Sequence, residues 1–446
     1  MSDLDSFQTL LSLKWGNLRT FLVWTKKVSF GKIGLKFGVF LERIERKRDK
    51  SRVKSTLFVI FSLVINLIYM QIVDSVQLDF SDVLIKPRRS SIDSRSKVNI
   101  SRDYRFKWCP STIKGTGIMQ SNMGTIGNFE VSRKMLNNGL FACLHKHHPV
   151  EQLIAFYKEL LEKEDGTWRR CLLSIGLRDN GIEKVREINK VLGIQVGIKF
   201  DVPNGYIPQV KERVIEIRKE FPDMFIMVGN VVTGDITEDL ILSGADCVAI
   251  GIGNGAQCLT RRQTGCGRPQ FSALVECADA AHQVGGMICC DGGITCPGDL
   301  GKAFGAGSDF IMIGSLFAGT DEADGDIITK WIFNGEYDCV ELNGITDSYQ
   351  KHLEKKEFKQ FYGMSSTLAQ EKFGNGKPSY RASEGRVTLM PYVGPINEVI
   401  EELLGGLRST MTYIGARNLK NIPKQCVFYK VHNQLNQTFE KNTVGK

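Results

Sequence analysis

The chain contains 446 residues, with 58 Lys plus Arg against 49 Asp plus Glu, 42% hydrophobic residues and 24% charged residues. This composition excludes a disordered or fibrous protein, because such chains lack the apolar residues of a large core. The formal net charge of +9 is modest for the length, and no long basic run is interleaved with aromatic residues, so we expect no nucleic-acid partner.

Residues 1–77 differ in pattern from the rest of the chain. A basic stretch, Arg46–Lys54, precedes the apolar run Leu57–Val73, which Asn66 and Gln71 interrupt. A membrane span needs about 20 apolar residues, with roughly 17 as the lower limit, so the run is borderline. Two interpretations stay open: a membrane anchor with its basic flank in the cytoplasm, or an extension that is buried, ill-defined or removed. We favour the second, and we expect a cytoplasmic protein.

From Gly115 onward, short apolar runs alternate with longer amphipathic segments, which is typical of a parallel sheet with crossover helices. The predicted strands are Gly117–Asn122, Leu140–His145, Cys171–Gly176, Gln195–Asp201, Phe225–Gly229, Cys247–Gly251, Met287–Asp291 and Phe310–Gly314. The predicted helices include Val150–Lys163, Ile182–Val191, Ile207–Glu220 and Phe271–Val284. Eight units favour a (β/α)8 TIM barrel with an N-terminal extension, and a doubly wound open sheet is the alternative.

Small and polar residues follow several of these strands. In a TIM barrel the carboxyl ends of the strands form the site, and the loops after the last two strands often bind phosphate. Asp291-Gly292-Gly293 and Gly314-Ser315 occupy those two positions. Glycine allows the close backbone approach that an anion bound by N–H groups requires. We therefore predict a phosphate site there, although tight turns would also explain the glycines.

The loop after the sixth strand contains the strongest candidate for chemistry. Gly251 to Arg262 place Cys258 on a glycine-rich loop, followed by Thr260 and two arginines. A partly exposed thiol near positive charge favours the nucleophilic thiolate. Carbonyl oxygens of Gly253, Gly255 and Cys258 could also coordinate a hard monovalent cation.

Most of the twelve cysteines lie in apolar runs and none forms a CxxC pair, so we expect reduced, buried thiols. His145, His147 and His148 lack a thiolate pair at zinc-finger spacing, and we expect no structural zinc there.

Residues Leu78 to about Leu419 resemble the guanosine monophosphate (GMP) reductase family, of the same superfamily as inosine monophosphate (IMP) dehydrogenase. The resemblance rests on the Cys258 loop and on these motifs: Leu78-Asp79-Phe80, Asp82-Val83-Leu84, His145-Lys146-His147, Asp201-Val202-Pro203-Asn204-Gly205-Tyr206, Gly229-Asn230-Val231-Val232-Thr233-Gly234, Glu276-Cys277-Ala278-Asp279-Ala280-Ala281-His282, Asp291-Gly292-Gly293, Phe361-Tyr362-Gly363-Met364-Ser365-Ser366 and Tyr380-Arg381-Ala382-Ser383-Glu384-Gly385. The His-Lys-His and Phe-Tyr-Gly-Met-Ser-Ser runs favour the reductase over the dehydrogenase.

The resemblance implies an enzyme of purine nucleotide salvage that irreversibly converts GMP to IMP and ammonia with NADPH. Attack of the Cys258 thiolate on the 2-amino carbon, with loss of ammonia, would give a thioimidate that hydride then resolves. Ammonia leaves only when protonated, and the family's candidates for that proton relay are Thr260 and Glu384. The alternatives are an IMP dehydrogenase and a non-catalytic or weakly active nucleotide-binding paralogue.

The resemblance also assigns binding residues. The implied GMP ligands are Asp291, Gly292, Gly293, Gly314, Ser315, Gly363, Met364, Ser365, Arg381, Ala382, Ser383, Glu384 and Gly385. NADPH would contact Lys146, Asp201, Val202, Pro203, Ile252, Gly253, Met364, Tyr380 and Arg381, with Ser94, Arg95, Ser409, Thr410, Met411 and Thr412 from a neighbouring subunit of a homotetramer. A monovalent cation, expected to be potassium, would bind at Gly253, Gly255, Cys258 and Arg261.

Four positions depart from the family pattern: Gly124 stands where an aspartate is usual, Asn254 replaces proline, Ala256 replaces serine and Ser315 replaces glycine. We expect these changes to lower activity. The segment Asp324–Lys359 is rich in Lys and Glu and is predicted to be a long, solvated loop inserted before the Phe361 motif. The expected domains are an extension (1–77), the catalytic barrel (78–420) and a tail (421–446).

Overall fold

The computed structural model describes residues 72–177, 180–342, 345–373 and 382–432. The chain divides into two units, Met1–Val76 and Gln77–Lys446, and all elements named here belong to the second. No helix of the described ranges combines the length and the apolar character that a membrane span requires. The run Leu57–Val73, for which an anchor was one interpretation, lies almost wholly outside these residues.

Eight parallel strands form the centre of this unit, and each predicted strand is present. Their spatial order is β4-β11-β10-β9-β8-β7-β6-β5, and a parallel bridge between Met119 and Phe141 joins the first to the last. The sheet is therefore a closed barrel, which confirms the TIM barrel and excludes the open sheet. The strands are β4 (Ile118–Gln120), β5 (Ala142–Leu144), β6 (Cys171–Ile175), β7 (Gly197–Asp201), β8 (Ile226–Val231), β9 (Cys247–Ile250), β10 (Met287–Asp291) and β11 (Phe310–Ile313).

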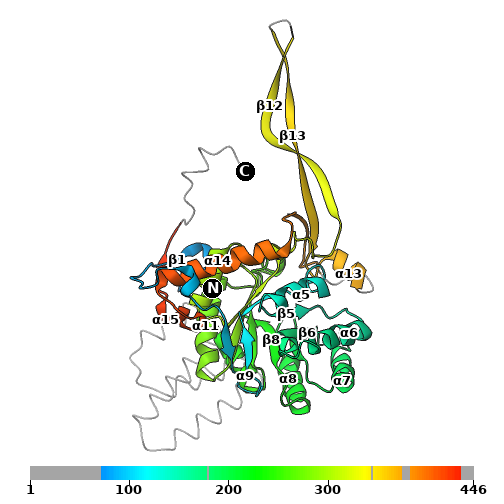
Figure 1. The fold of residues 1–446 in the computed structure, drawn as a ribbon, viewed down its shortest axis with the longest axis vertical. Helices are drawn as coiled ribbons and strands as arrows, with labels where there is room; N and C mark the ends of the chain where they lie inside the picture. The colour runs from blue at the N-terminus through cyan, green and yellow to red at the C-terminus, as the bar shows by residue number, and fades with distance from the viewer. Residues whose placement is uncertain (1–71, 178–179, 343–344, 374–381, 433–446) are drawn as a thin grey trace, which may run out of the picture. The chain divides into compact units, whose positions relative to one another are not determined.

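Helices surround these strands, as Figure 1 shows. The predicted helices are confirmed to within two residues at each end, because amphipathic periodicity marks the middle of a helix better than its ends. The outer helices are α5 (Phe129–Asn137), α6 (Val150–Leu161), α7 (Gly181–Leu192), α8 (Pro208–Glu220), α9 (Gly234–Leu242), α11 (Gln270–Gln283), α12 (Pro297–Gly305) and α14 (Ile396–Ile414).

Side chains of each strand point alternately into the barrel and toward the helices, which divides the core into two layers. In β9, Cys247 and Ala249 face the barrel interior, whereas Val248 and Ile250 face the helices, as the two-residue period of a strand requires. The hairpin of β2 (Arg102–Tyr104) and β3 (Ile113–Gly115) adds Tyr104 to the interior layer. The ring of Tyr104 stacks on Phe310 with centroids 4.5 Å apart, and this stack fills one end of the barrel.

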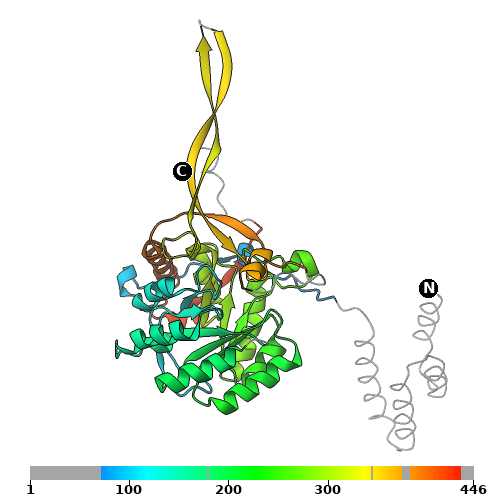
Figure 2. The same ribbon diagram turned by 90° about the vertical axis from the view of Figure 1, so that its right-hand side faces the viewer.

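The segment predicted as a solvated loop is instead a long antiparallel hairpin. Strands β12 (Ile327–Leu342) and β13 (Ile345–Tyr362) run side by side (Figures 1 and 2), and β14 (Val387–Pro391) pairs with the end of β13. The loop prediction was wrong because it weighed Lys and Glu above the β-formers, such as Ile327-Ile328-Thr329 and Trp331-Ile332-Phe333. A two-stranded ribbon exposes both faces, so it accepts polar residues without an apolar face.

Short elements complete the fold. Strand β1 (Val83–Ile85) pairs with β15 (Phe428–Lys430), so the start and the end of the described barrel unit are joined. Helices α10 (Thr260–Thr264) and α13 (Thr367–Phe373) lie in the loops at the candidate site, and α15 (Ile422–Gln425) precedes β15.

Candidate active site

The thiol of Cys258 lies in the loop after β9 and begins a line of three polar groups. Its Sγ donates to the hydroxyl of Thr260 at 3.2 Å, and that hydroxyl donates to Oε2 of Glu384 at 2.7 Å. Cys258 is half-buried, whereas most other described cysteines are buried thiols. Burial raises the pKa of Cys171 and Cys290 to about 12 and of Cys277 to about 11, which keeps them protonated and unreactive.

Backbone bonds hold the glutamate segment against the cysteine loop. Leu259 donates its N–H to the carbonyl of Glu384 at 2.6 Å, and Arg386 donates to the carbonyl of Gln257 at 3.0 Å. Cys258 and Gly385 form an antiparallel bridge. These bonds make Glu384 part of a small ladder with the cysteine loop, so its carboxylate is positioned by main chain on both sides.

Two glycines permit this close approach. A Cβ at Gly385 would lie 2.7 Å from the backbone nitrogen of Ser366, and one at Gly363 would lie 3.1 Å from the Cα of Gly385. Both distances are too short for a side chain without a backbone shift. The segment between β11 and α14 is called the flap below. Its residues 363–366 and 383–386 approach each other closely at these two glycines, where a side chain would require the backbone to move.

The predicted phosphate cradle lies beside the same loop. Gly292 and Gly293 have φ of +88° and +85°, a region that L side chains rarely adopt. Asn254 donates through Nδ2 to the carbonyl of Asp291 at 2.9 Å, and this bond ties the cysteine loop to the cradle. Asn254, a departure from the family pattern, thus has a structural role. Gly314 and Ser315 follow β11, where Ser315 begins the short helix η4 (Ser315–Phe317).

A buried lysine beneath the site joins two of the predicted ligand carboxylates. Lys199, with a side chain only 2% exposed, lies 2.9 Å from Asp201 and 2.9 Å from Asp291. Burial alone would lower the pKa of Lys199, but the two carboxylates hold it well above its ordinary value. Burial would likewise raise the pKa of Asp201, yet the charge and hydrogen bonds of Lys199 and a bond from Asn122 keep it below its ordinary value.

The sequence prediction missed this network. Asn122 accepts from Lys199 at 3.1 Å, and Asn230 donates to Asp291 at 3.0 Å. One signal was available in the sequence. The run Gly197-Ile198-Lys199-Phe200-Asp201 puts Lys199 on the same face as Asp201, inside the barrel. A lysine facing a barrel interior needs carboxylate partners at the strand ends.

The remaining predicted ligands fall into three groups. Ser383 donates its hydroxyl to the carbonyls of Ser365 and Gly385, at 3.3 and 3.0 Å, so these three flap residues lie together. The charge of Lys146 acts on Asp201, which places two predicted NADPH ligands near each other, and Val202 is buried while Pro203 is exposed. Tyr380 and Arg381 lie outside the described residues, and Ala382 is exposed.

The residues predicted to serve a neighbouring subunit lie together on a second surface. Ser94 caps the short helix η2 (Arg95–Lys97), which contacts α14, the helix that carries Ser409, Thr410 and Thr412. Met411 is fully buried, side chain and backbone alike, so the described unit does not expose this predicted ligand. The ligand roles of all these residues stay predictions.

The predicted cation ligands are chemically suitable. The carbonyls of Gly255 and Arg261 each accept one backbone N–H, at 2.9 and 3.1 Å. A carbonyl oxygen has a second lone pair, so each could still coordinate a monovalent cation. No group of three or more His, Cys, Asp or Glu able to hold a metal occurs within the ranges that the structure describes.

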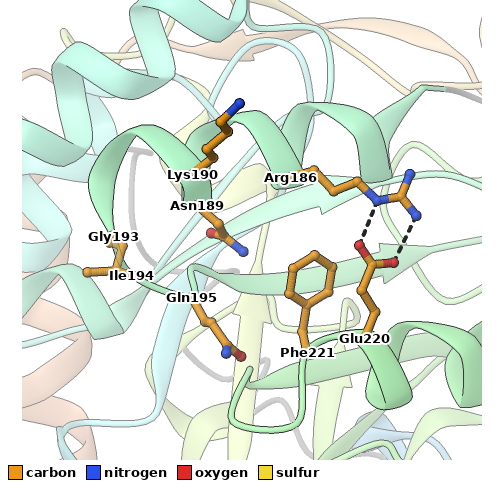
Figure 3. Close-up of a pocket in the computed structure, with 8 residues that line it drawn as sticks. All are labelled: Arg186, Asn189, Lys190, Gly193, Ile194, Gln195, Glu220 and Phe221. Atoms are coloured by element: carbon orange, nitrogen blue, oxygen red, sulfur yellow. Dashed lines mark hydrogen bonds and ion pairs between the residues drawn. The ribbon is translucent and has the colours of Figure 1, made fainter.

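A separate pocket lies at the opposite end of the barrel (Figure 3). Its walls come from the end of α7, the turn before β7 and the end of α8, where Arg186 and Glu220 form an ion pair. None of the predicted site residues lines it. This pocket is therefore distinct from the site at the carboxyl ends of the strands.

Fold and site together define a (β/α)8 barrel that carries a thiol, a hydroxyl and a carboxylate in line beside a glycine cradle. The family model described as "IMP dehydrogenase / GMP reductase domain" matches residues 77–337 and 341–438, so the chain belongs to this family. The match also runs through most of the β12–β13 hairpin.

Known relatives agree with this assignment. GMP reductases of Vibrio parahaemolyticus and Vibrio atlanticus are each 41% identical over 372 residues, which is 83% of this chain and 99% and 100% of theirs. The GMP reductase of Vibrio cholerae is 40% identical over 370 residues, covering 83% of this chain and 99% of its own. The recognition of a GMP reductase-like chain from its motifs is confirmed.

Proposed function

We propose that this protein is a GMP reductase that uses NADPH to convert GMP irreversibly to IMP and ammonia, in purine nucleotide salvage. The observation that carries the proposal is the continuous path from the Cys258 thiol through Thr260 to Glu384. The relatives named GMP reductase support the choice of substrate.

The path accounts for both proton movements that the reaction needs. The thiol proton moves to the Thr260 hydroxyl while the hydroxyl proton moves to Glu384, which leaves a thiolate and a neutral carboxylic acid. The thiolate attacks the 2-amino carbon of the purine. The carbon–nitrogen bond breaks as the same relay returns the proton to the departing ammonia, and a thioimidate on Cys258 remains.

NADPH, when bound, supplies the hydride that replaces sulfur at the purine carbon. The carbon–sulfur bond then breaks and the thiolate is released. Lys146 and Asp201 would orient the dinucleotide, and the ion pair with Lys199, which also contacts Asp291, supports this role because it keeps Asp201 ionised. The carbonyls of Gly255 and Arg261 would hold a potassium ion that fixes the shape of the cysteine loop.

The test of the reaction is direct. Purified protein is expected to oxidise NADPH only when GMP is present, and Cys258→Ala is expected to abolish this without lowering the melting temperature. Intact mass spectrometry after mixing with GMP alone should find an adduct that maps to Cys258. NADPH oxidation without GMP, an active Cys258→Ala variant, or reduction of NAD with IMP would contradict the proposal, and the last result would identify a dehydrogenase.

We further propose a cytoplasmic homotetramer. The free thiols of the described residues suit a reducing compartment. The shared surface of η2 and α14 would complete the NADPH site of a neighbouring subunit. Light scattering should give four times the chain mass, and a monomer that is fully active would overturn the shared site.

A further inference from the structure

The loop between β4 and α5 contacts both ends of the flap segment that follows β11. Asp324, where the segment leaves the barrel, donates its N–H to the carbonyl of Thr125 at 2.8 Å, and Asn128 donates to the side chain of Asp324 at 2.8 Å. Where the segment returns, Met364 accepts the N–H of Gly124 through its sulfur at 3.1 Å. This loop is therefore the surface on which the flap rests.

Gly124 lies against two aromatic side chains of the flap. It is buried, and a Cβ placed on it would lie 2.9 Å from the hydroxyl of Tyr362 and 2.9 Å from Cε2 of Phe373. The φ of Gly124 is not in the left-handed region, so its backbone does not itself require glycine. The constraint is one of space: the Tyr362 hydroxyl and the Phe373 ring occupy the volume that a side chain would fill, so these two side chains would have to move.

The contact continues as a stack of rings. Phe373, the last residue of α13, stacks on His147 with centroids 4.3 Å apart and an interplanar angle of 11°, and His145 stacks on His148 at 3.7 Å. Lys372 lies over the ring of Tyr362 at 5.8 Å. Tyr362 is only 4% exposed, and its hydroxyl has no hydrogen-bond partner among the described residues. Packing, to which Gly124 contributes, therefore holds this side chain rather than a hydrogen bond of its hydroxyl.

We propose that Gly124 is a positioning residue whose missing side chain forms the socket for Tyr362 and Phe373 and so holds the flap closed over Cys258. Tyr362 is followed directly by Gly363-Met364-Ser365, which are predicted GMP ligands. The same closed flap carries Glu384 to Thr260. The consequence for GMP rests on the proposed function, whereas the closure itself does not.

The family pattern, with an aspartate at this position, led us to expect that Gly124 lowers activity. The proposed socket predicts instead that replacing Gly124 lowers it. If glycine at this position were simply a lost acidic group, Gly124→Asp would restore activity. If the glycine is a socket, a new side chain pushes Tyr362 and Phe373 away and lowers the closed fraction of the flap. Because apparent affinity falls with the fraction of the competent state, a closed fraction of about one tenth raises the KM for GMP about tenfold. Bound GMP recloses the flap, so kcat at saturation stays within about twofold.

Two measurements on the full chain test the socket. Hydrogen exchange of the α13 amides in the nucleotide-free protein should be at least several-fold faster in Gly124→Ala and Gly124→Asp than in the parent. Steady-state kinetics should show the rise in KM without a matching fall in kcat. Gly298→Ala is the matched control, because Gly298 is exposed and a Cβ there meets only the Cys296 sulfur, at 3.8 Å, so it should change neither quantity.

A second-site variant separates the socket from general loss of structure. Phe373→Leu shortens the ring that meets position 124, so adding Gly124→Ala to it should raise KM less than Gly124→Ala does alone. Unchanged α13 exchange in both Gly124 variants, or a higher kcat/KM in Gly124→Asp, would overturn the proposal. If the parent protein shows no GMP-dependent turnover, the proposed function fails, and the exchange data alone still decide whether the socket exists.

Discussion

The two ends of the barrel interior differ in the kind of side chain that fills them. At the amino ends of the strands, aromatic rings from the β2–β3 hairpin and from β11 stack in the interior, led by Tyr104 and Phe310. At the carboxyl ends, the interior holds a buried lysine and two carboxylates, surrounded by glycine turns. The amino end is filled by aromatic side chains, and the carboxyl end holds charged groups beside the cysteine loop. We therefore expect side chains at the amino end to contribute to stability and side chains at the carboxyl end to contribute to the reaction.

The largest effect is expected from the carboxylate of the relay. Glu384→Gln keeps the size of the side chain but removes the proton acceptor, so kcat should fall about 10²–10⁴-fold while the melting temperature stays constant. Glu371→Gln, an exposed carboxylate of α13, is the control and should leave kcat unchanged. Equal activity of the Glu384 variant and the parent would remove Glu384 from the mechanism.

The opposite end should respond in stability alone. Tyr104 is fully buried, and Tyr104→Ala should lower the free energy of unfolding by about 3–5 kcal/mol in urea denaturation. Activity per folded molecule should stay within about twofold of the parent. Trp331, a hairpin residue that is 65% exposed, is the control, and Trp331→Ala should change stability by no more than about 0.5 kcal/mol. A large loss of kcat in folded Tyr104→Ala would show that the two ends are coupled.

Lys199→Met tests the charged end directly. Loss of the Lys199 ammonium leaves the charges of Asp201 and Asp291 without their buried partner. The free energy of unfolding should therefore fall by about 3 kcal/mol. The comparison is Lys211→Met, which breaks an exposed pair with Asp239 and should cost about 0–1 kcal/mol. Similar losses in the two variants would mean that burial of Lys199 contributes nothing special.

The smallest expected effect is on the stability of the protein at acidic pH, and it comes from His145. Burial, followed by the nearby charges of His148 and His147, lowers the pKa of His145 to about 3 from an ordinary 6.5. At pH values between about 3 and 6.5, His145 is protonated in the unfolded chain but not in the folded one. The free energy of unfolding therefore falls as the pH drops below 6.5, by about 2 kcal/mol at about pH 5. His145→Gln cannot take up that proton, and its urea midpoint should depend less on pH over this range. Parallel pH dependences in the two proteins would contradict the assignment.

The sequence predicted the scaffold well because its signals are local. Alternation within each strand and amphipathic helices between them are properties of short segments, and they located all eight strands. Cys258 is the predicted nucleophile because a thiol on a glycine-rich loop at a strand end differs from the cysteines in apolar runs, and its catalytic role stays a prediction. The pairing of Thr260 with Glu384 came only from the family resemblance, since no local signal joins residues so far apart in the chain.

What the sequence did not predict depends on side chains that meet across the barrel or the flap. Lys199 and its partner Asp291 are 92 residues apart in the chain, so no local pattern pairs them. Asn254 looked like a departure with a cost, yet it donates to the Asp291 carbonyl. The hairpin was missed because a ribbon exposed on both faces shows no apolar periodicity, so composition alone described it as a loop.

The pairing of β13 with β14 has a consequence for the order in which the site assembles. The ladder pairs Tyr362 with Val387. The chain that leaves β13 after Tyr362 and enters β14 at Val387 therefore begins and ends at neighbouring positions beside the cysteine loop. Much of the chain entropy lost in bringing Glu384 to Thr260 is therefore already removed when the ribbon forms. A break in the backbone between α13 and Ala382 would leave each new terminus tethered to the barrel, and the two halves of the relay would still find each other.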